Sequence, residues 1–284
     1  MPASDLPKAK VRAAVAEDFD QVYPLLQQLN NTRFTKAIWK RLFTNLWEQE
    51  NGSPGYVLDT GEKIVGFLGG ICSETMSGNQ SQVVCNLTAW IVEEEYRSAS
   101  MMLLMPFLRQ KTVVLTSLTS SPEAYAVYKK LGFKDLDTAA RVIYPFPAFM
   151  SNVELITEPE QVRSLLSEQE RQSFDDHASL DVWQCVIKKE DCICYLLGFR
   201  RLGRGHIQRV GDIELFRESI AQVRWRLCKE IDVKSLQVDE RFLEGKKLLL
   251  SRLKHFPQPK QYKGSIPAER VNASYSELVV LATP

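Results

Sequence analysis

The sequence predicts a mixed α/β fold, an α+β arrangement around a mixed sheet, whose plan occurs twice along the chain. In the first half, apolar patterns with strand and helix periods follow one another in the order β-α-α-β-β-β-α-β-α-β. In the second half, residues 158–168 repeat the Gln-Val-x-x-Leu-Leu pattern of residues 18–28, again just after a short strand. With 284 residues, the chain is long enough for two ordinary domains.

Each element of the first half follows from a local pattern. Residues 11–15 predict a short strand, and apolar spacing predicts helices at 18–29 and 36–48. Asp59-Thr60-Gly61-Glu62 lies between two apolar runs and predicts a β-hairpin, followed by a polar loop at 73–81. The remaining elements are expected in the order strand, helix, strand, helix, strand, at 82–92, 100–108, 112–118, 122–132 and 140–146.

The second half is expected to follow the same order. Thr157 and Glu160 have the spacing of a capping box, which predicts the start of a helix. A hairpin is expected to turn at Lys189-Glu190-Asp191. The later elements are expected as a strand at 206–215, a helix at 219–231, a strand at 235–242 and a C-terminal strand at 275–282.

Two further stretches bear on the organisation of the chain. Pro145 and Pro147 stiffen residues 145–150, which predicts a linker and therefore two domains, 1–147 and 148–284. Residues 245–264 carry six Lys and Arg residues and no acid. This basic segment is either a solvated helix face followed by a loop or a surface that faces an anion.

Charge and cysteine patterns narrow the class of protein. Lys and Arg total 36 while Asp and Glu total 35, so no net field favours a nucleic acid or a membrane as partner. The N-terminus lacks the apolar segment of a signal peptide, and no apolar run reaches the roughly 20 residues of a membrane span. The six cysteines lie in apolar or alternating segments without zinc-ligand spacing. We therefore expect reduced cysteines, no metal site and a cytoplasmic location.

Three stretches of the first half carry a resemblance to a known family. They are the strand end "TAWIV" (88–92), the turn that Arg97 opens, and "SSPEAYAVYKKLGF" (120–133). Together they resemble a Gcn5-related N-acetyltransferase (GNAT) domain, whose ending Tyr-x-x-Leu-Gly-Phe is matched at 128–133. The resemblance covers about residues 10–145, and the remainder is similar only as a weak, degenerate second copy. It implies a fourth and a fifth strand that part, with the pantetheine arm of acetyl-CoA, or of another acyl-CoA, along the exposed strand edge.

The turn after the fourth strand departs from the family pattern. GNAT domains have Arg/Gln-x-x-Gly-x-Gly/Ala there, and the backbone N–H groups of this turn bind the pyrophosphate of the co-substrate. Here Ser100 and Met102 stand at the two glycine positions. Helix N–H groups and the helix dipole do not depend on the side chain, so an altered loop still binds a phosphate if Met102 points into the core. A vestigial loop is the alternative. The resemblance implies co-substrate contacts from Ile91, Val92, Arg97, Ser98, Ala99, Ser100, Met101, Met102 and Ser121.

Catalytic residues are less clearly indicated. The resemblance places the general-acid tyrosine of the family at Tyr128, where a hydroxyl can protonate a departing thiolate. Alternatively, Tyr128 is packed under its helix. Ser121 is either a co-substrate contact or the N-cap of the helix that begins at Pro122. No general base stands out, since the acidic run 93–95 is typical of a solvated turn.

The sequence therefore predicts an acyl-CoA-dependent acyltransferase that moves an acetyl group to an amine or hydroxyl acceptor, either a small molecule or a protein amine. The second half is expected to be structural or to shape the acceptor pocket, because it has no turn like that at Arg97. Two alternatives remain open. One is a non-catalytic GNAT-like protein that senses CoA or acts as a scaffold. The other is an acyltransferase with an aminoacyl-tRNA donor, which the basic C-terminal third permits.

Overall fold

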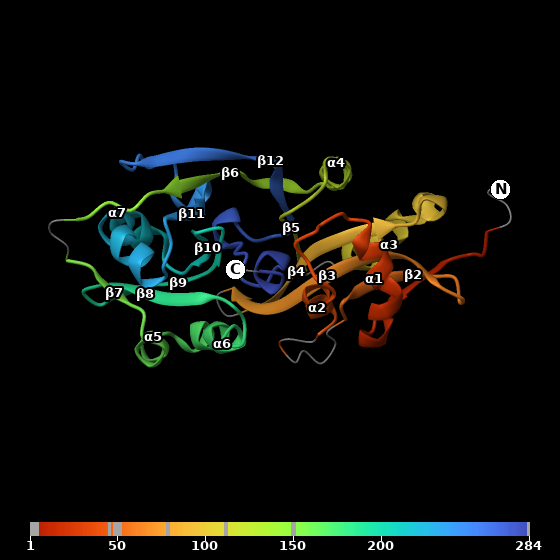
Figure 1. Cartoon of the computed structure of the whole chain (residues 1–284), viewed down its shortest axis with the longest axis horizontal. Helices are drawn as coiled ribbons and strands as arrows, with labels where there is room; N and C mark the ends of the chain where they lie inside the picture. The colour runs from red at the N-terminus through yellow and green to blue at the C-terminus, as the bar shows by residue number, and fades with distance from the viewer. Residues whose placement is uncertain are drawn as a thin grey trace. The chain divides into compact units, whose positions relative to one another are not determined.

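The computed structural model describes residues 6–44, 47, 53–77, 80–110, 113–148 and 152–282 (Figure 1). The chain forms two compact units. Unit 1 consists of Met1–Lys134 with Tyr262–Ser265, and unit 2 of Asp135–Gln261 with Ile266–Pro284. No helix in the described part of the chain is both long and apolar enough to cross a membrane.

Unit 1 has the strand order β1-β2-β3-β4-β5, followed by the last residues of strand β12. Only β4 and β5 are parallel to each other among the five successive strands. The expected helix at 36–48 is short, because a 3-10 helix at Arg41–Phe43 follows it; residues 45, 46 and 48 lie outside the described residues. The elements are β1 Lys10–Ala13, α1 Phe19–Gln27, α2 Lys36–Lys40, β2 Gly55–Asp59, β3 Ile64–Ser77, β4 Gln80–Val92, α3 Met101–Arg109, β5 Val114–Ser117 and α4 Pro122–Lys130.

The hairpin of β3 and β4 corrects two expectations. The predicted loop at 73–81 is largely strand, since pairing continues to Ser77 and Gln80, while residues 78 and 79 lie outside the described residues. Cys72 and Cys85 are paired in this register with a Cα–Cα distance of 4.0 Å, and a disulfide joins them. The expectation of reduced cysteines is therefore wrong for this pair. Cys185, Cys194 and Cys228 are buried free thiols, while Cys192 is exposed.

One core of unit 1 lies between the sheet and helices α3 and α4. Leu103, Leu104 and Phe107 form the buried face of α3. The Phe107 ring lies against Gly70 of β3, where a Cβ atom would come within 2.5 Å of the ring. At the end of α4, Gly132 has a φ of +84°, which favours glycine, and the ammonium group of Lys263 donates to the Leu131 carbonyl at 2.7 Å. Strand β12 thus closes the last turn of α4.

Unit 2 contains the strand order β12-β6-β11-β10-β9-β8-β7. Unit 2 begins at Asp135, whereas the sequence predicted a domain boundary after Pro147. The boundary is earlier because strand β6 belongs to unit 2, where it pairs with β11 from Ala140–Asp239 to Ile143–Leu236. The elements are β6 Lys134–Ile143, β7 Glu154–Ile156, α5 Pro159–Leu165, α6 Glu168–Asp176, β8 Trp183–Lys189, β9 Cys192–Arg201, β10 Arg204–Val210, α7 Ile213–Glu230, β11 Ser235–Asp239, β12 Ser251–Lys263 and α8 Glu277–Val280.

Three local predictions for this unit are wrong. The capping box is at Ser167 and Glu170, which begin α6, while the N-cap of α5 is Glu158 without a side-chain bond. Residues 275–282 contain the buried helix α8 instead of a strand. The basic segment 245–264 contains the whole of strand β12, Ser251–Lys263, and is not a helix face. The hairpin turn at 189–191 is confirmed.

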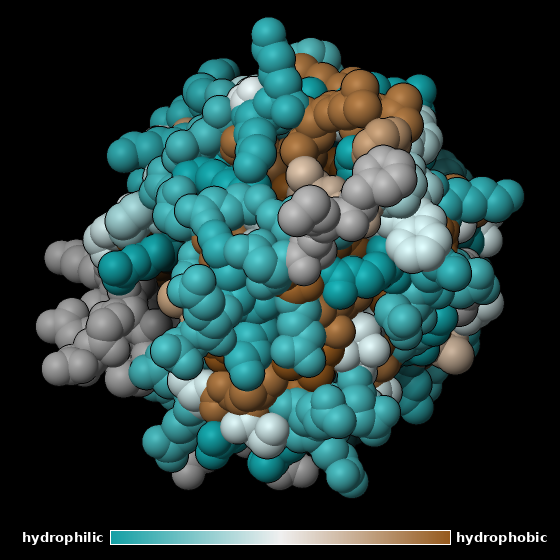
Figure 2. Space-filling model, turned by 90° about the vertical axis from the view of Figure 1, so that its left-hand side faces the viewer, coloured by the Kyte–Doolittle hydropathy of each residue, from teal (hydrophilic) through white to brown (hydrophobic). Residues whose placement is uncertain are grey.

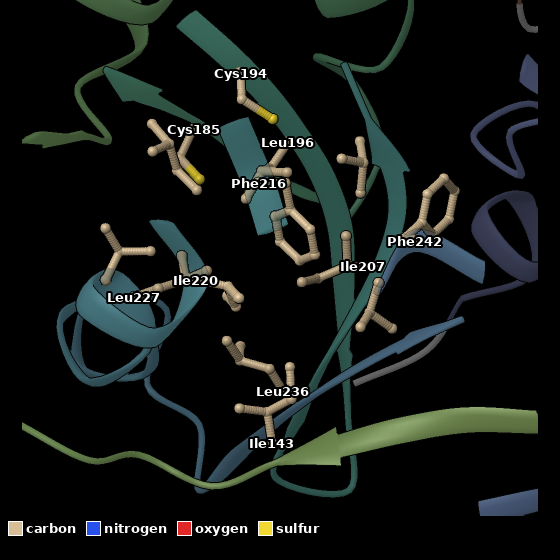
Figure 3. Packing of buried hydrophobic residues seen from close by; sticks show 14 of the residues in the cluster. Ile143, Cys185, Cys194, Leu196, Ile207, Phe216, Ile220, Leu227, Leu236 and Phe242 are labelled. Carbon is tan, nitrogen blue, oxygen red and sulfur yellow. The ribbon is translucent and has the colours of Figure 1, made fainter. Parts of the chain in front are cut away.

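The core of unit 2 forms where α7 packs against the sheet (Figure 3). Side chains from α7 and from strands β6, β8, β9, β10 and β11 meet there, joined by Phe242 after β11. Those labelled in Figure 3 are Ile143, Cys185, Cys194, Leu196, Ile207, Phe216, Ile220, Leu227, Leu236 and Phe242.

The two units share a succession of elements. The strands β7-β8-β9-β10 are antiparallel and β10 is parallel to β11, as β1-β2-β3-β4 are antiparallel and β4 is parallel to β5. In each case a helix lies between the two parallel strands in the sequence, the nine-residue α3 in unit 1 and the 18-residue α7 in unit 2. A duplication of one ancestral domain remains a prediction.

Candidate functional site

Two parallel strands of unit 1 part from each other. Strand β4 pairs with β5 from Val84–Val114 to Asn86–Thr116. At the last pair, the Asn86 side chain donates to the Thr116 hydroxyl at 3.1 Å in a buried position. Beyond it, β4 continues to Val92 while β5 ends at Ser117. Among the described residues, no strand pairs with β4 on the β5 side beyond Asn86. The edge that carries Ile91 and Val92 can therefore pair with an extended ligand, as an added strand would.

A β-bulge lies on the parted half of β4. The register with β3 shifts between the pairs Phe67–Ile91 and Gly69–Thr88, so Ala89 and Trp90 together oppose one residue of β3. Ala89 has a φ of +50°, in the left-handed region that residues other than glycine seldom adopt. Strained backbone of this kind is concentrated at functional sites. The bulge bends β4 at the place where β5 leaves it.

Trp90 and Tyr128 come together beside this bulge. Their ring centroids are 5.5 Å apart, and the ring of Tyr128 also contacts Phe133 at 4.8 Å. Tyr128 is buried, at 2% exposure, within the core cluster of unit 1. The indole Nε1 of Trp90 is buried and has no hydrogen-bond acceptor. A buried donor without an acceptor is rare, and a ligand that brings an oxygen atom would satisfy it.

Trp90 was missed by sequence reasoning. It belongs to the strand "TAWIV", where an aromatic residue indicates only a pleated, half-buried surface. Its position at the bulge depends on the register of β3 and β4, which no local pattern reveals.

The turn after β4 is a 3-10 helix, Glu94–Ala99, which leads through Ser100 into α3. The Ser100 N–H donates to the Arg97 carbonyl at 3.1 Å, so this part of the turn is satisfied internally. Met101 and Met102 occupy the first two positions of α3, whose N–H groups have no acceptor within an α-helix. These N–H groups and the helix dipole form the place in the turn that suits an anion.

The condition stated for phosphate binding by the altered loop, that Met102 points into the core, is not met. Its side chain is 44% exposed, because Leu103, Leu104 and Phe107 form the buried face of α3. An exposed, unbranched side chain has rotamer freedom to move away from a ligand at the helix N-terminus.

Two ion pairs involve charged groups of the turn. Arg97 forms an ion pair with Glu94 at 2.7 Å, with both side chains mostly exposed, and Lys63 pairs with Glu93 at 2.7 Å. At the start of α4, hydrogen bonds from its own backbone N–H and from Ser121, together with the charge of Arg97, hold the pKa of Glu123 below its usual value. Arg97 therefore lies within electrostatic reach of the N-terminus of α4.

The second interpretation of Ser121 is confirmed. Its hydroxyl accepts a hydrogen bond from the Ala124 N–H at 3.2 Å, and Pro122 takes the first helical position. Within the described residues, no group of three or more His, Cys, Asp or Glu side chains is placed to hold a metal ion.

The chain itself fills the corresponding place in unit 2. Strand β10 parts from β11 after the pair His206–Gln237. Just beyond, the Gln208 carbonyl accepts a hydrogen bond from the Ala273 N–H at 3.1 Å, so the C-terminal segment pairs there. At the start of α7, the Asp212 carboxylate accepts from the Leu215 N–H at 2.9 Å. A carboxylate at this N-cap occupies the position where a phosphate would bind.

Comparisons with known proteins give matches among solved structures. No family model matches the sequence, and no curated protein matches it. A GCN5-related N-acetyltransferase of Anabaena variabilis has a TM-score of 0.56 at 12% identity, over 89% of this chain and 72% of its own. One of Kribbella flavida has a TM-score of 0.53 at 10% identity, over 92% and 72%. A structure from Pyrococcus horikoshii has a TM-score of 0.52 at 12% identity, over 94% and 92%.

These matches define the class of fold. The chain has the fold of the GCN5-related N-acetyltransferases, as the resemblance in the sequence implied. At 10–12% identity the likeness concerns the fold alone.

Proposed function

We propose that unit 1 is an acyl-CoA-dependent acyltransferase that moves an acetyl group to an amine or hydroxyl acceptor. The observation that supports it most is the parting of β4 and β5 at Asn86–Thr116, with the N-terminus of α3 at the far end of the open strand. An open edge that leads to free helix N–H groups suits a ligand with an amide-containing arm and a diphosphate.

The groups that would hold the co-substrate are on the chain. The open edge at Ile91 and Val92 would pair with the pantetheine amides, and the N–H groups of Met101 and Met102 would receive the diphosphate. Arg97 would exchange Glu94 for a phosphate oxygen at little cost, because an exposed ion pair contributes only about 0–1 kcal/mol. The small side chains of Ser98, Ala99 and Ser100 would let the backbone of the turn come close to the co-substrate. Ser121 already has a hydrogen-bond partner in its own helix.

The chemistry follows from the groups near the bulge. When bound, an acyl-CoA supplies an activated thioester carbonyl. The unpaired indole N–H of Trp90 is a buried donor available to an oxygen atom in this region. The hydroxyl of Tyr128 would give a proton to the departing thiolate. The main contribution of the chain would be to position donor and acceptor.

Unit 2 would not bind a second co-substrate. Its parted strand is paired with the C-terminal segment at Ala273, and the Asp212 carboxylate caps its helix. These features support a structural role for unit 2 in the proposed enzyme.

Binding of acetyl-CoA tests the proposal. A ligand that binds only the native state stabilises it, by about 2.7 kcal/mol at 100 times its Kd. We expect acetyl-CoA, or a longer acyl-CoA, to raise the melting temperature and to release or absorb heat in titration calorimetry. Adenosine 3′,5′-bisphosphate, which lacks the diphosphate and the pantetheine arm, serves as control and should bind far more weakly. No thermal shift and no heat with any acyl-CoA would contradict the proposal.

Replacing the Tyr128 hydroxyl tests its role in turnover. Removal of a general acid typically slows a reaction by about 100-fold or more, so Tyr128→Phe should lower kcat by that order. Its Kd for acetyl-CoA should stay close to that of the unaltered protein. Tyr125→Phe, one turn earlier on α4, is the matched control and should leave kcat unchanged. Equal kcat for the two variants would remove Tyr128 from the mechanism.

A CoA-sensing protein without catalysis is the second candidate. Two ion pairs favour this candidate: Glu93 is paired with Lys63, and Glu94 is paired with Arg97. Neither carboxylate is therefore free to act as the general base that an acyl transfer to an amine needs. In that case acetyl-CoA would bind in the calorimeter, while hydrolysis and transfer to a panel of amines would stay at the rate of the reaction without protein. Binding heat with an aminoacyl-tRNA, and none with an acyl-CoA, would support an acyltransferase whose donor is an aminoacyl-tRNA.

A further inference from the structure

One end of the unit 2 sheet exposes an unusual number of large apolar side chains. The described chain has ten such side chains with high exposure, and six of them belong to unit 2. These six are Tyr144 at 36%, Leu202 at 88%, Trp225 at 40%, Leu249 at 65%, Leu250 at 52% and Leu253 at 42%. Figure 2 shows apolar surface, coloured brown, beside hydrophilic side chains on the side where α7 lies in Figure 1.

The strand register brings these side chains to one end of the sheet. One row of paired residues crosses four neighbouring strands. It consists of Ile143 in β6, Leu236 in β11, Gly205 in β10 and Arg200 in β9. The next residues along this end are therefore Tyr144, the start of β11, and the β9–β10 turn that contains Leu202.

The turn before β12 joins this end through hydrogen bonds. The Tyr144 N–H donates to the Leu250 carbonyl at 2.9 Å. The guanidinium of Arg224, on α7, donates to the Leu249 carbonyl and lies 5.3 Å from the ring centroid of Phe146. Trp225 follows Arg224 on α7. We call this set of six side chains the leucine end of unit 2.

Two of the leucines are held in unfavourable backbone conformations. Leu250 has a φ of +53° and Leu202 a φ of +50°, and both are at exposed turns where glycine or asparagine would fit with less strain. Neither side chain is buried, so packing in the core does not account for them. The φ of Leu202 and of Gly203 is the one that the two-residue turn between β9 and β10 requires. The unusual feature is the choice of an exposed leucine for such positions, where glycine, asparagine or aspartate is preferred.

Cations lie close to the leucine end in the sequence, and the ammonium group of Lys229 lies 4.6 Å from the ring centroid of Trp225. The chain as a whole is nearly neutral, but this region is not. Near Leu202, the exposed Arg200 forms an ion pair with Asp181 at 3.6 Å. Five other exposed cations, in residues 229–234 and 247–254, form no ion pair among the described residues, and these two segments contain only two acids, Glu230 and Asp232. These cations are Lys229, Lys234, Lys247, Arg252 and Lys254.

We propose that the leucine end of unit 2 binds the surface of an anionic lipid bilayer. The leucines at the two turns would enter the boundary between headgroups and acyl chains, with Trp225 and Tyr144 at the headgroup level. The lysines and arginines would meet the anionic headgroups. Aliphatic side chains gain from hydrocarbon and not from a nucleic acid, whose binding rests on phosphates and base stacking. The contact is peripheral, and it is independent of the proposed acyltransfer.

Co-sedimentation of the full chain with vesicles tests this inference. We expect binding to phosphatidylcholine vesicles that contain phosphatidylserine, weak binding to phosphatidylcholine alone, and loss of binding as salt rises. Leu249→Ser with Leu250→Asn should weaken binding by about tenfold or more, since two inserted side chains are lost. Asparagine tolerates the φ of residue 250, so this variant should keep its fold, which circular dichroism checks. Leu29→Ser, at an exposed leucine of unit 1, is the matched control and should bind as the unaltered protein does.

Each other outcome overturns the proposal. Absence of sedimentation with both kinds of vesicle does so directly. Unchanged binding by the Leu249 and Leu250 variant, together with loss in a Lys247→Ala, Arg252→Ala and Lys254→Ala variant, would show that charge alone holds the vesicles and that the leucines do not enter the bilayer. Self-association that the leucine variant abolishes, without vesicle binding, would assign it to an interface between copies of the chain.

Discussion

Replacing Arg241 by methionine is expected to lower the free energy of unfolding by about 3–5 kcal/mol. Arg241 forms ion pairs with Asp137 and Asp239, and Lys260 also pairs with Asp239 at 2.8 Å. The four side chains are at most 11% exposed and their charges balance. Methionine would leave two buried carboxylates with only one cation. It would also remove the hydrogen bond from Arg241 to the Val271 carbonyl, which holds the C-terminal segment.

Urea unfolding followed by circular dichroism measures this effect. Arg163→Met in the same unit is the matched control, because Arg163 pairs with Asp175 in an exposed position. Its loss should cost less than about 1 kcal/mol. If Arg241→Met costs no more than Arg163→Met, the buried pairs do not stabilise unit 2 in the way inferred here.

Replacing Ser100 by glutamate is expected to raise the Kd for acetyl-CoA by about 100-fold. Ser100 is the N-cap of α3, and a carboxylate there would lie next to the diphosphate of the proposed co-substrate. Two like charges about 5 Å apart repel by about 3 kcal/mol at an effective dielectric constant near 20. An acidic group at a helix N-terminus stabilises the helix, so the melting temperature without ligand should not fall.

Titration calorimetry compares Ser100→Glu with Ser100→Gln, which has the same size and no charge. Glutamine should change Kd by less than about threefold, since an uncharged side chain leaves the helix N–H groups free. Equal affinities of the two variants would place the diphosphate away from α3. Failure of the unaltered protein to bind acetyl-CoA would instead reject the co-substrate itself.

Local sequence patterns predicted the turns and helix ends, whose conformation is determined by a few consecutive residues. The hairpin at 189–191 and the glycine that ends α4 were found because turn chemistry is encoded within a few residues. The short apolar run at 275–282 was assigned to the wrong class, since such a run is compatible with a strand or a buried helix.

Features that depend on distant pairing could not be predicted in the same way. Strand β12 is rich in lysine and arginine, which suggested solvent exposure, and its partner β6 lies more than 100 residues earlier. Cys72 and Cys85 are joined because the register of a long hairpin places them opposite each other. The sequence placed Tyr128 and the turn at Arg97 in the candidate site through the family resemblance. The bulge at Ala89 and the unpaired indole of Trp90 emerged only from that register.

The end of β12 has a consequence for how the protein is made. Tyr262–Ser265 belong to unit 1, although more than 100 residues of unit 2 precede them in the chain. A ribosome therefore supplies this last piece of unit 1 only after it has translated residues 135–261 of unit 2. Truncated genes that encode only the first half would yield a polypeptide with an unfilled sheet edge, prone to aggregate during expression.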